Sequence, residues 1–294
     1  MTILAELKAV LVAVTGVEPR VLTIQDGTAL PSGPFQMLHR SLQAGLRQWV
    51  EEQTHHPLGY VEQLYTFAER DLSSQGGHRI AISYLGLTSE GRAAGWRNWY
   101  DYFPWEDHRA GPPALVSDFI TPQLGEWAGD AAERLRRVAA LFGIDAPWNE
   151  ELVLQRYELL FEAGLMEEAH QPGRDASGKR SPAALGRAMA GDNRRVLATG
   201  IARLRAKIKY RPVVFELMPP DFTLLQLQRS VEAIAGRLVH KQNFRRLIEQ
   251  QELVEETGAS HQDTGGRPAK LFRFRREVLA ERALVGTKLP LPPS

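Results

Sequence analysis

The residues best suited to chemistry lie between positions 241 and 246, where cationic and amide side chains flank one aromatic ring. The set is Lys241, Gln242, Asn243, Phe244, Arg245 and Arg246. Arg and Lys neutralise phosphates and offer paired donors to guanine, whereas Gln and Asn match the adenine edge in the major groove. These residue types predict a segment that reads double-stranded DNA.

Two helices are predicted to position this segment. Thr223 and Gln226 have the spacing of a capping box, and Gly236 is a suitable C-terminal stop for the helix that they begin. A second helix is predicted over residues 240–251, after a short break, with Phe244 among its buried residues. This spacing is typical of a helix-turn-helix.

A basic hairpin is predicted behind the second helix. A Gly-rich turn at residues 257–268 leads into a strand in which Phe272 and Phe274 face one side and Arg273 and Arg275 the other. Such a wing can meet phosphates, and Arg267, Lys270 and Arg273 are its predicted phosphate contacts. A winged helix used only for protein contacts or dimerisation stays open as an alternative.

The charge distribution agrees with this prediction. Residues 207–283 contain 14 Lys and Arg against 10 Asp and Glu, whereas residues 1–206 contain 21 against 25. The C-terminal part is therefore the candidate for a polyanionic partner, although this balance alone is a weak signal.

Composition excludes several classes of function. The chain has no cysteine, so it can form no disulfide, thiolate zinc site or cysteine nucleophile. No run of about 18 uncharged apolar residues could span a bilayer. We therefore expect a soluble, cytoplasmic protein with no membrane partner.

The N-terminal part is predicted to be α+β. Strands are expected at residues 10–14 and 21–24, then at 60–67 and 79–87, with a helix over 36–53 between the two pairs. The helix prediction includes Met37 and Leu38 in its apolar stripe. Strands, helix, strands is the resulting order.

The middle of the chain, about 90–180, is predicted to be mostly helical and begins with a dense aromatic run at residues 96–105. These rings either form a core or dimer surface, or one or two of them stack on a base or nicotinamide ring. Trp99 and Tyr102 are the candidates for the second role.

A connector helix is predicted at about 192–209, behind a loop at residues 171–182. We divide the chain into a domain at 1–206, with a helical insertion at about 110–185, and a winged-helix domain at 207–294. The insertion contains no motif that indicates a role.

Several segments resemble the Nudix-related transcriptional regulators of NAD metabolism, the NrtR family. The similarity is strongest over residues 192–228, followed by NFRR at 243–246 and GRPAKLFRF at 266–274. Upstream, YVEQLYTF and RIAISYLGL are similar to strands of that family, and LPSGPF lies where its LPGGF turn would be. The long insertion is similar to the divergent NadQ-type repressors of this family.

The Nudix signature, G-x5-E-x7-R-E-U-x-E-E-x-G-U with U apolar, can be placed on the chain without gaps. Gly33, Arg47, Trp49, Glu51 and Glu52 keep the pattern. Four positions depart from it: His39, Gln48, Thr54 and His55. By resemblance, Arg47, Glu51 and Glu52 are carried over as candidates for effector binding, with a solvated Glu pair as the alternative.

The departures bear on catalysis. Nudix enzymes hold magnesium with carboxylates on one helix face, and Gln48 offers only a neutral carbonyl there. We therefore expect a degenerate Nudix-like domain that is not an enzyme. The two adjacent residues His55 and His56 would diverge by about 100° on a helix and make a poor metal clamp, so no metal site is expected. A pyrophosphatase acting on ADP-ribose or NADH, with an accessory winged domain, is the alternative.

The resemblance implies a homodimeric repressor that binds a near-palindromic operator of NAD biosynthesis genes. It also implies an adenine nucleotide effector, which would be NAD, ADP-ribose or ATP, and no required cofactor. A nucleotide-binding scaffold that never touches DNA is a third possibility, and the basic wing argues against it.

Overall fold

The computed structural model describes residues 3–56, 58–70, 78–91, 94–170, 183–261 and 268–275. Within these residues, no helix has both the length and the apolar composition needed to cross a bilayer.

In the described part of the chain, six strands form one mixed sheet in the order β4-β5-β1-β2-β6, with β3 also paired to β1. Their bounds are β1 (Ile3–Thr15), β2 (Glu18–Leu22), β3 (Ser32–Pro34), β4 (Tyr60–Arg70), β5 (His78–Leu87) and β6 (Trp96–Asn98). The central strand β1 is antiparallel to β2 and β3 but parallel to β5. Both predicted strand pairs are confirmed, and the short strands β3 and β6 were not predicted.

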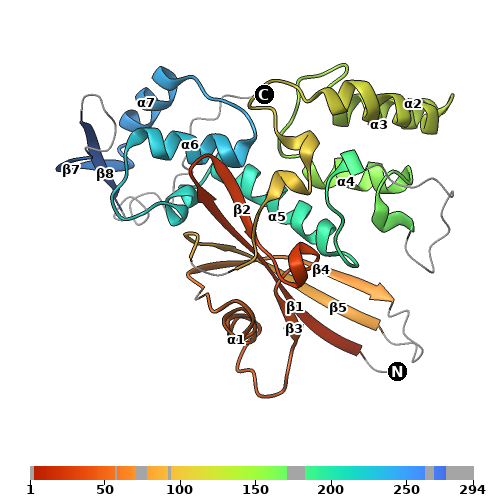
Figure 1. Cartoon of the computed structure of the whole chain (residues 1–294), viewed down its shortest axis with the longest axis horizontal. Coiled ribbons are helices and arrows are strands. Elements are labelled where there is room, and N and C mark those ends of the chain that lie inside the picture. Colours follow the sequence, from red (N-terminus) through yellow and green to blue (C-terminus); the bar gives the residue numbers. More distant parts are fainter. Residues whose placement is uncertain are drawn as a thin grey trace.

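Different helices cover the two faces of the sheet (Figure 1). Side chains alternate along a strand, so Leu7, Leu11 and their neighbours face α1 (Leu42–Thr54), where they pack with Leu46 and Val50. Val10 and Val12 point the other way, into the main core beneath α5 (Asn193–Ile208). The sheet therefore lies between α1 on one face and α5 on the other.

The helix α1 begins later than the sequence predicts. Met37 and Leu38 are almost fully exposed, and the chain becomes helical only at Leu42. Ser41 provides the reason, because its extended backbone and its hydroxyl, which accepts from the Ala44 amide at 3.1 Å, make it the N-cap. The apolar spacing of residues 37 and 38 was therefore a misleading signal.

The predicted insertion is helical. It contains α2 (Thr121–Ala128), α3 (Ala132–Phe142) and α4 (Val153–Glu162). Of these, α4 lies beside α5, and α2 and α3 lie farther out at the edge of the molecule (Figure 1). The helix predicted at about 192–209 is present as α5. This helix approaches the sheet closely, because a Cβ at Gly200 would lie 2.8 Å from the Val10 side chain.

The C-terminal part consists of α6 (Leu224–Ala235), α7 (Lys241–Gln250) and a hairpin of β7 (Val254–His261) and β8 (Ala269–Phe274). These elements lie together at one end of the molecule, opposite α2 and α3 (Figure 1). One buried apolar cluster runs from Val10 of the sheet through Leu204 of α5 to Phe244 of α7. The two predicted domains thus share packed contacts.

Candidate nucleic-acid interface

The helix α6 has both of the predicted ends. The Thr223 hydroxyl accepts from the Gln226 amide at 3.1 Å, and the Gln226 side chain accepts from the Thr223 amide at 2.7 Å. This reciprocal capping box satisfies two backbone donors that the helix itself cannot. At the other end Gly236 has φ of 72°, the left-handed conformation that favours glycine.

Two polar side chains of α6 hold the turn that leads to α7. The carboxylate of Glu232 accepts from the Val239 amide at 3.0 Å. The amide of Gln228 donates both to Glu232 and, at 3.2 Å, to the Val239 carbonyl. Because these bonds are buried, they fix the angle at which α7 leaves α6.

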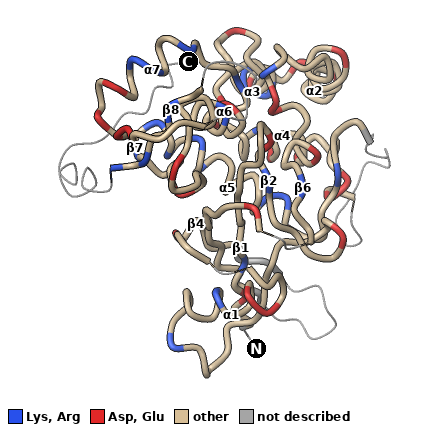
Figure 2. Tube along the Cα trace, turned by 60° about the vertical axis from the view of Figure 1, so that its left-hand side comes forward, with Lys and Arg blue, Asp and Glu red and all other residues tan. Residues whose placement is uncertain are grey.

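The helix α7 separates an apolar face from a polar one. Phe244 and Ile248 are buried against α6, whereas the predicted DNA-reading residues are all exposed: Lys241, Gln242, Asn243, Arg245 and Arg246. Figure 2 shows Lys and Arg along α7 at the outside of the molecule. In the described part of the chain, neither Arg245 nor Arg246 has an ion-pair partner. The structure thus brings the predicted residues together on an accessible surface.

The wing carries its cations in pairs with carboxylates. Lys270 of β8 contacts Glu256 of β7 at 2.8 Å, and Arg273 contacts Glu255 at 2.5 Å. All four side chains are well exposed, so these pairs are screened by solvent and can exchange partners. The predicted contact Arg267 lies outside the described residues.

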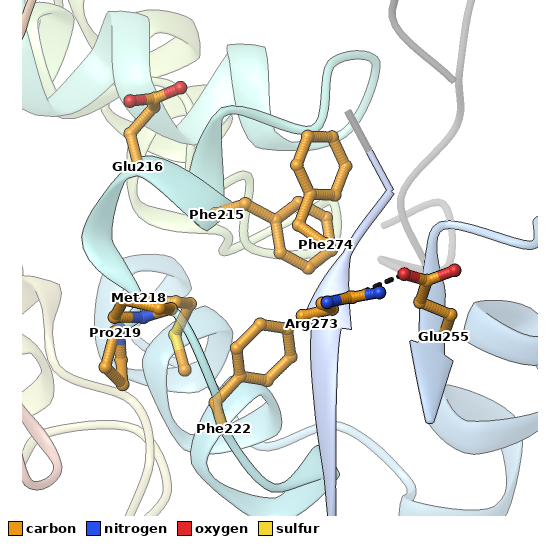
Figure 3. Close-up of a pocket in the computed structure, with 9 residues that line it drawn as sticks. Phe215, Glu216, Met218, Pro219, Phe222, Glu255, Arg273 and Phe274 are labelled. Carbon is orange, nitrogen blue, oxygen red and sulfur yellow. Dashed lines mark hydrogen bonds and ion pairs between the residues drawn. The ribbon is translucent and has the colours of Figure 1, made fainter. Parts of the chain in front are cut away.

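An aromatic cluster attaches the wing to the rest of the molecule (Figure 3). Phe274 stacks on Phe215 with centroids 4.2 Å apart, and the backbones of Phe222 and Phe272 exchange hydrogen bonds of 2.9 and 2.8 Å. A pocket of about 530 Å³ opens beside these rings, with the Arg273–Glu255 pair on its wall. The orientation of the wing is therefore determined by packing.

The Nudix-like helix does not gather a magnesium site. Gln48, Glu51 and Glu52 are exposed on α1, and the Gln48 amide donates to Glu52 at 2.8 Å. Within the described residues, no three His, Asp or Glu side chains lie close enough to hold a metal ion. Two carboxylates and a neutral amide are a poor donor set for Mg²⁺, so these residues do not fit the metal of the Nudix signature.

Other residues of the signature have structural contacts. The guanidinium of Arg47 donates to the carbonyls of Leu58 and Gly59, which joins α1 to the start of β4. Trp49 donates to the Pro34 carbonyl at 2.9 Å and covers Gly33, where a Cβ would lie 2.3 Å from the indole. The Gly33 position thus requires a glycine because of a close approach.

The histidines after α1 have different environments. His55 is exposed in the left-handed conformation at the C-cap, whereas His56 is buried against Trp96. Burial lowers the pKa of His56 below its usual value, which favours the neutral ring whose Nε2 lies 2.8 Å from the Thr88 hydroxyl.

The prediction that Trp99 and Tyr102 contact the effector is wrong. Both are fully buried in the main core, and the Tyr102 hydroxyl donates to the Gly27 carbonyl at 2.7 Å. Neither ring has a face on which a nucleotide could stack. They lie across the sheet from the packed face of α1, so they do not join Arg47, Glu51 and Glu52. The core interpretation of the aromatic run accounts for both residues.

A buried polar group that was not predicted from the sequence lies beside the helix-turn-helix. Glu106 forms ion pairs with both Arg156 and Arg205, all three side chains have essentially no exposed surface, and the Tyr100 hydroxyl lies next to Arg205. Buried charges of this kind are rare and costly unless they are paired. No local spacing indicated them, because Glu106 and Arg205 are 99 positions apart.

Fold and surface together define a protein in which a mixed sheet covered by helices packs against a winged helix-turn-helix. Comparison with known proteins supports this class. Residues 214–274 match the family model of the NrtR DNA-binding winged helix domain. An 86-residue segment is 42% identical to the ADPR responsive transcriptional repressor NtrR of Acinetobacter baylyi, covering 29% of this chain and only 34% of that relative.

Solved structures resemble the whole chain. The crystal structure of Shewanella oneidensis NrtR complexed with a 27mer DNA has a TM-score of 0.53 at 18% identity, over 94% of this chain and 95% of that one. A MutT/nudix family protein from Enterococcus faecalis has a TM-score of 0.53 at 15% identity, over 94% and 87%. At these identities the similarity establishes the fold.

Proposed function

We propose that this protein is a transcriptional repressor that binds operator DNA through α7 and the wing, and that senses an adenine nucleotide through its Nudix-like sheet without hydrolysing it. The observation that carries the proposal is the accessible polar face of α7. Five residues with the donors and acceptors of base edges and phosphates project there from a helix whose opposite face is buried. The match of residues 214–274 to a DNA-binding family agrees with it.

The dimensions of α7 suit the major groove. An α-helix with its side chains is about 10–12 Å in diameter, which matches a groove about 12 Å wide, and the 10 residues of α7 extend about 15 Å along it. Asn243, Arg245 and Arg246 would then meet bases or phosphates, while Lys270, Arg273 and Arg267 of the wing would meet the backbone. A homodimer would present two such helices to a near-palindromic operator.

ADP-ribose is the leading effector candidate, because the Acinetobacter baylyi relative is named as ADPR responsive. NAD and ATP share the adenosine diphosphate moiety and remain candidates. The exposed pair Glu51 and Glu52 and the neighbouring Arg47 are the proposed effector contacts on α1. Because Gln48 replaces a carboxylate, the domain would act as a sensor. The protein would belong to a NadQ-type branch and control NAD biosynthesis genes.

A DNA selection assay tests the proposal. Full-length protein is incubated with random duplexes in parallel with ADP-ribose, NAD, ATP or no nucleotide, and enriched sequences are read out. We expect a near-palindromic motif, affinity that falls steeply with salt because several phosphates are neutralised, and a change in affinity with one nucleotide. Folded protein that enriches no sequence under any of these conditions would overturn the assignment.

A further inference from the structure

A buried ionic cluster lies at the contact between the sheet, the insertion and the helix-turn-helix. Glu106 receives Arg156 Nε on one carboxylate oxygen at 2.6 Å and Arg205 Nη1 on the other at 2.6 Å. Arg156 comes from α4 and Arg205 from α5, so three parts of the chain meet there. Because burying ions usually adds little net stability, such a cluster is better explained by the geometry that it imposes.

Arg205 of this cluster and the adjacent Tyr100 bind the C-terminal end of α6. Arg205 Nε donates to the Ile234 carbonyl at 2.8 Å, and the Tyr100 hydroxyl donates to the Ala233 carbonyl at 2.7 Å. These carbonyls are among the last four of the helix, which have no partner within it. The body of the protein therefore supplies the hydrogen bonds that complete α6.

The contact leaves little space for movement. At Gly236 a Cβ would lie 2.4 Å from the Glu106 carbonyl, 2.7 Å from Arg205 Nη2 and 2.9 Å from the Tyr100 hydroxyl. The Gly236 carbonyl also accepts from the His108 amide at 2.7 Å. Since Gln228 and Glu232 hold the following turn, a displacement of the end of α6 would carry α7 with it.

Tyr100 is also close to the sheet in sequence and in space. It belongs to the short 3-10 helix Trp99–Asp101, which follows β6 directly, and β6 pairs with β2 through Leu22 and Trp96. Trp96 packs in the same buried cluster as Leu46 and Val50 of α1. The cluster that contains α1 is thus joined to α6 through Trp96, the short chain segment from β6 to Tyr100, and the bond from Tyr100 to Ala233.

We propose that Tyr100 and Arg205 are positioning residues that transmit the state of the Nudix-like sheet to the helix-turn-helix by holding the end of α6. This inference builds on the proposed function, in which the sheet senses a nucleotide and α7 binds DNA. Neither side chain would touch the DNA or the effector. Their role is to set the orientation in which α7 is presented.

The chain offers a matched pair of variants, Tyr100→Phe and Tyr102→Phe. Both tyrosines are buried, and each hydroxyl donates one hydrogen bond of 2.7 Å to a backbone carbonyl. The carbonyl is Ala233 of α6 for Tyr100 but Gly27, between β2 and β3, for Tyr102. The Tyr100 hydroxyl also accepts from Arg205 Nη2 at 3.3 Å. Tyr102→Phe should therefore lower the melting temperature by about 2 to 4 °C, the effect of one hydrogen bond in a protein of this size, and Tyr100→Phe by at least as much.

Operator affinity is measured for both variants with and without ADP-ribose. We expect Tyr100→Phe to change the ratio of the two affinities by about fivefold or more, which is the lower range of allosteric coupling, and Tyr102→Phe to leave it within about twofold. Equal ratios in the two variants would overturn the inference. Wild-type protein that binds no DNA, or ignores ADP-ribose, would instead count against the proposed function.

Hydrogen–deuterium exchange provides a readout that needs neither DNA nor ADP-ribose. Tyr100→Phe should speed exchange of the amides from residue 236 to 250, because the end of α6 has lost a hydrogen bond from the body. Tyr102→Phe should leave these amides unchanged and affect those near Gly27. The same exchange pattern in both variants would show that Tyr100 has no special role in positioning α7.

Discussion

The side-chain amide of Gln48 donates a hydrogen bond to the Glu52 carboxylate at 2.8 Å along one face of α1. In the predicted placement of the Nudix signature, this neutral amide stands where the signature has a carboxylate. Its hydrogen bond also engages one oxygen of the Glu52 carboxylate. A hard cation such as Mg²⁺ prefers anionic oxygens, so this arrangement weakens the site. The same helix can still contact a nucleotide through hydrogen bonds.

Gln48→Glu should make the protein respond to magnesium more strongly than the wild type. A carboxylate at position 48 would be repelled by those at positions 51 and 52, by about 0.2–0.5 kcal/mol per pair. A bound cation removes this repulsion. Melting temperatures of both proteins are measured over a MgCl₂ titration. An equal magnesium response in the two, or magnesium-dependent hydrolysis of ADP-ribose by the wild type, would contradict the loss of the metal site.

Arg245→Ala and Arg246→Ala should each weaken operator binding while leaving the fold unchanged. Both side chains are exposed, so their loss removes no packing, whereas a base-contacting arginine contributes about 1–3 kcal/mol, or roughly fivefold to 150-fold in affinity. Fluorescence anisotropy with the selected operator measures the loss. Arg136→Ala, an exposed arginine on α3, is the control. Wild-type affinity in both α7 variants would show that α7 is not part of the DNA interface.

Glu255→Gln and Glu256→Gln should strengthen DNA binding. Each carboxylate pairs with a wing cation, Arg273 or Lys270, and so competes with phosphate for it. Removing the carboxylate should tighten binding at low salt and steepen the salt dependence by about one unit per added phosphate contact. Glu133→Gln on α3 makes the same charge change away from the wing. Equal effects of all three variants would indicate a general charge effect.

Glu106→Gln should reduce stability at neutral pH and flatten its acid dependence. Burial alone would raise the pKa of Glu106, but Arg156 and Arg205 outweigh it and hold this pKa below its usual value of 4.5. The unfolded chain therefore binds the proton first, and the stabilisation is complete above pH 4.5 and is lost as pH falls below it. At neutral pH the variant should lose about 3–5 kcal/mol, because two buried guanidinium groups lack a counter-charge.

Urea unfolding from about pH 3 to pH 7 measures this difference. The free energies of unfolding of wild type and variant should converge toward the acidic end, because protonation of this carboxyl in the unfolded chain removes the stabilisation of the wild type there. A constant gap over the whole range would mean that Glu106 is not the titrating group.

Elements defined by short-range signals could be predicted from the sequence. Thr223, Gln226 and Gly236 are capping residues whose bonds lie within a few positions, and the structure has α6 between them. The predicted burial of Phe244 likewise identified the face of α7 that packs inward. The same kind of signal failed at Met37 and Leu38, because helical spacing does not show where the chain leaves the core.

The sequence by itself determined the mixed α and β content, the helix-turn-helix and the chemical character of the α7 surface, because helix caps and side-chain periodicity act over one or two turns. Only the tertiary structure decided that Trp99 and Tyr102 are core residues, since an aromatic ring suits a core and a ligand site equally well. It alone also joined Tyr100 to Ala233, 133 positions away. Contacts at such separations depend on how the sheet and helices pack, and no local pattern encodes them.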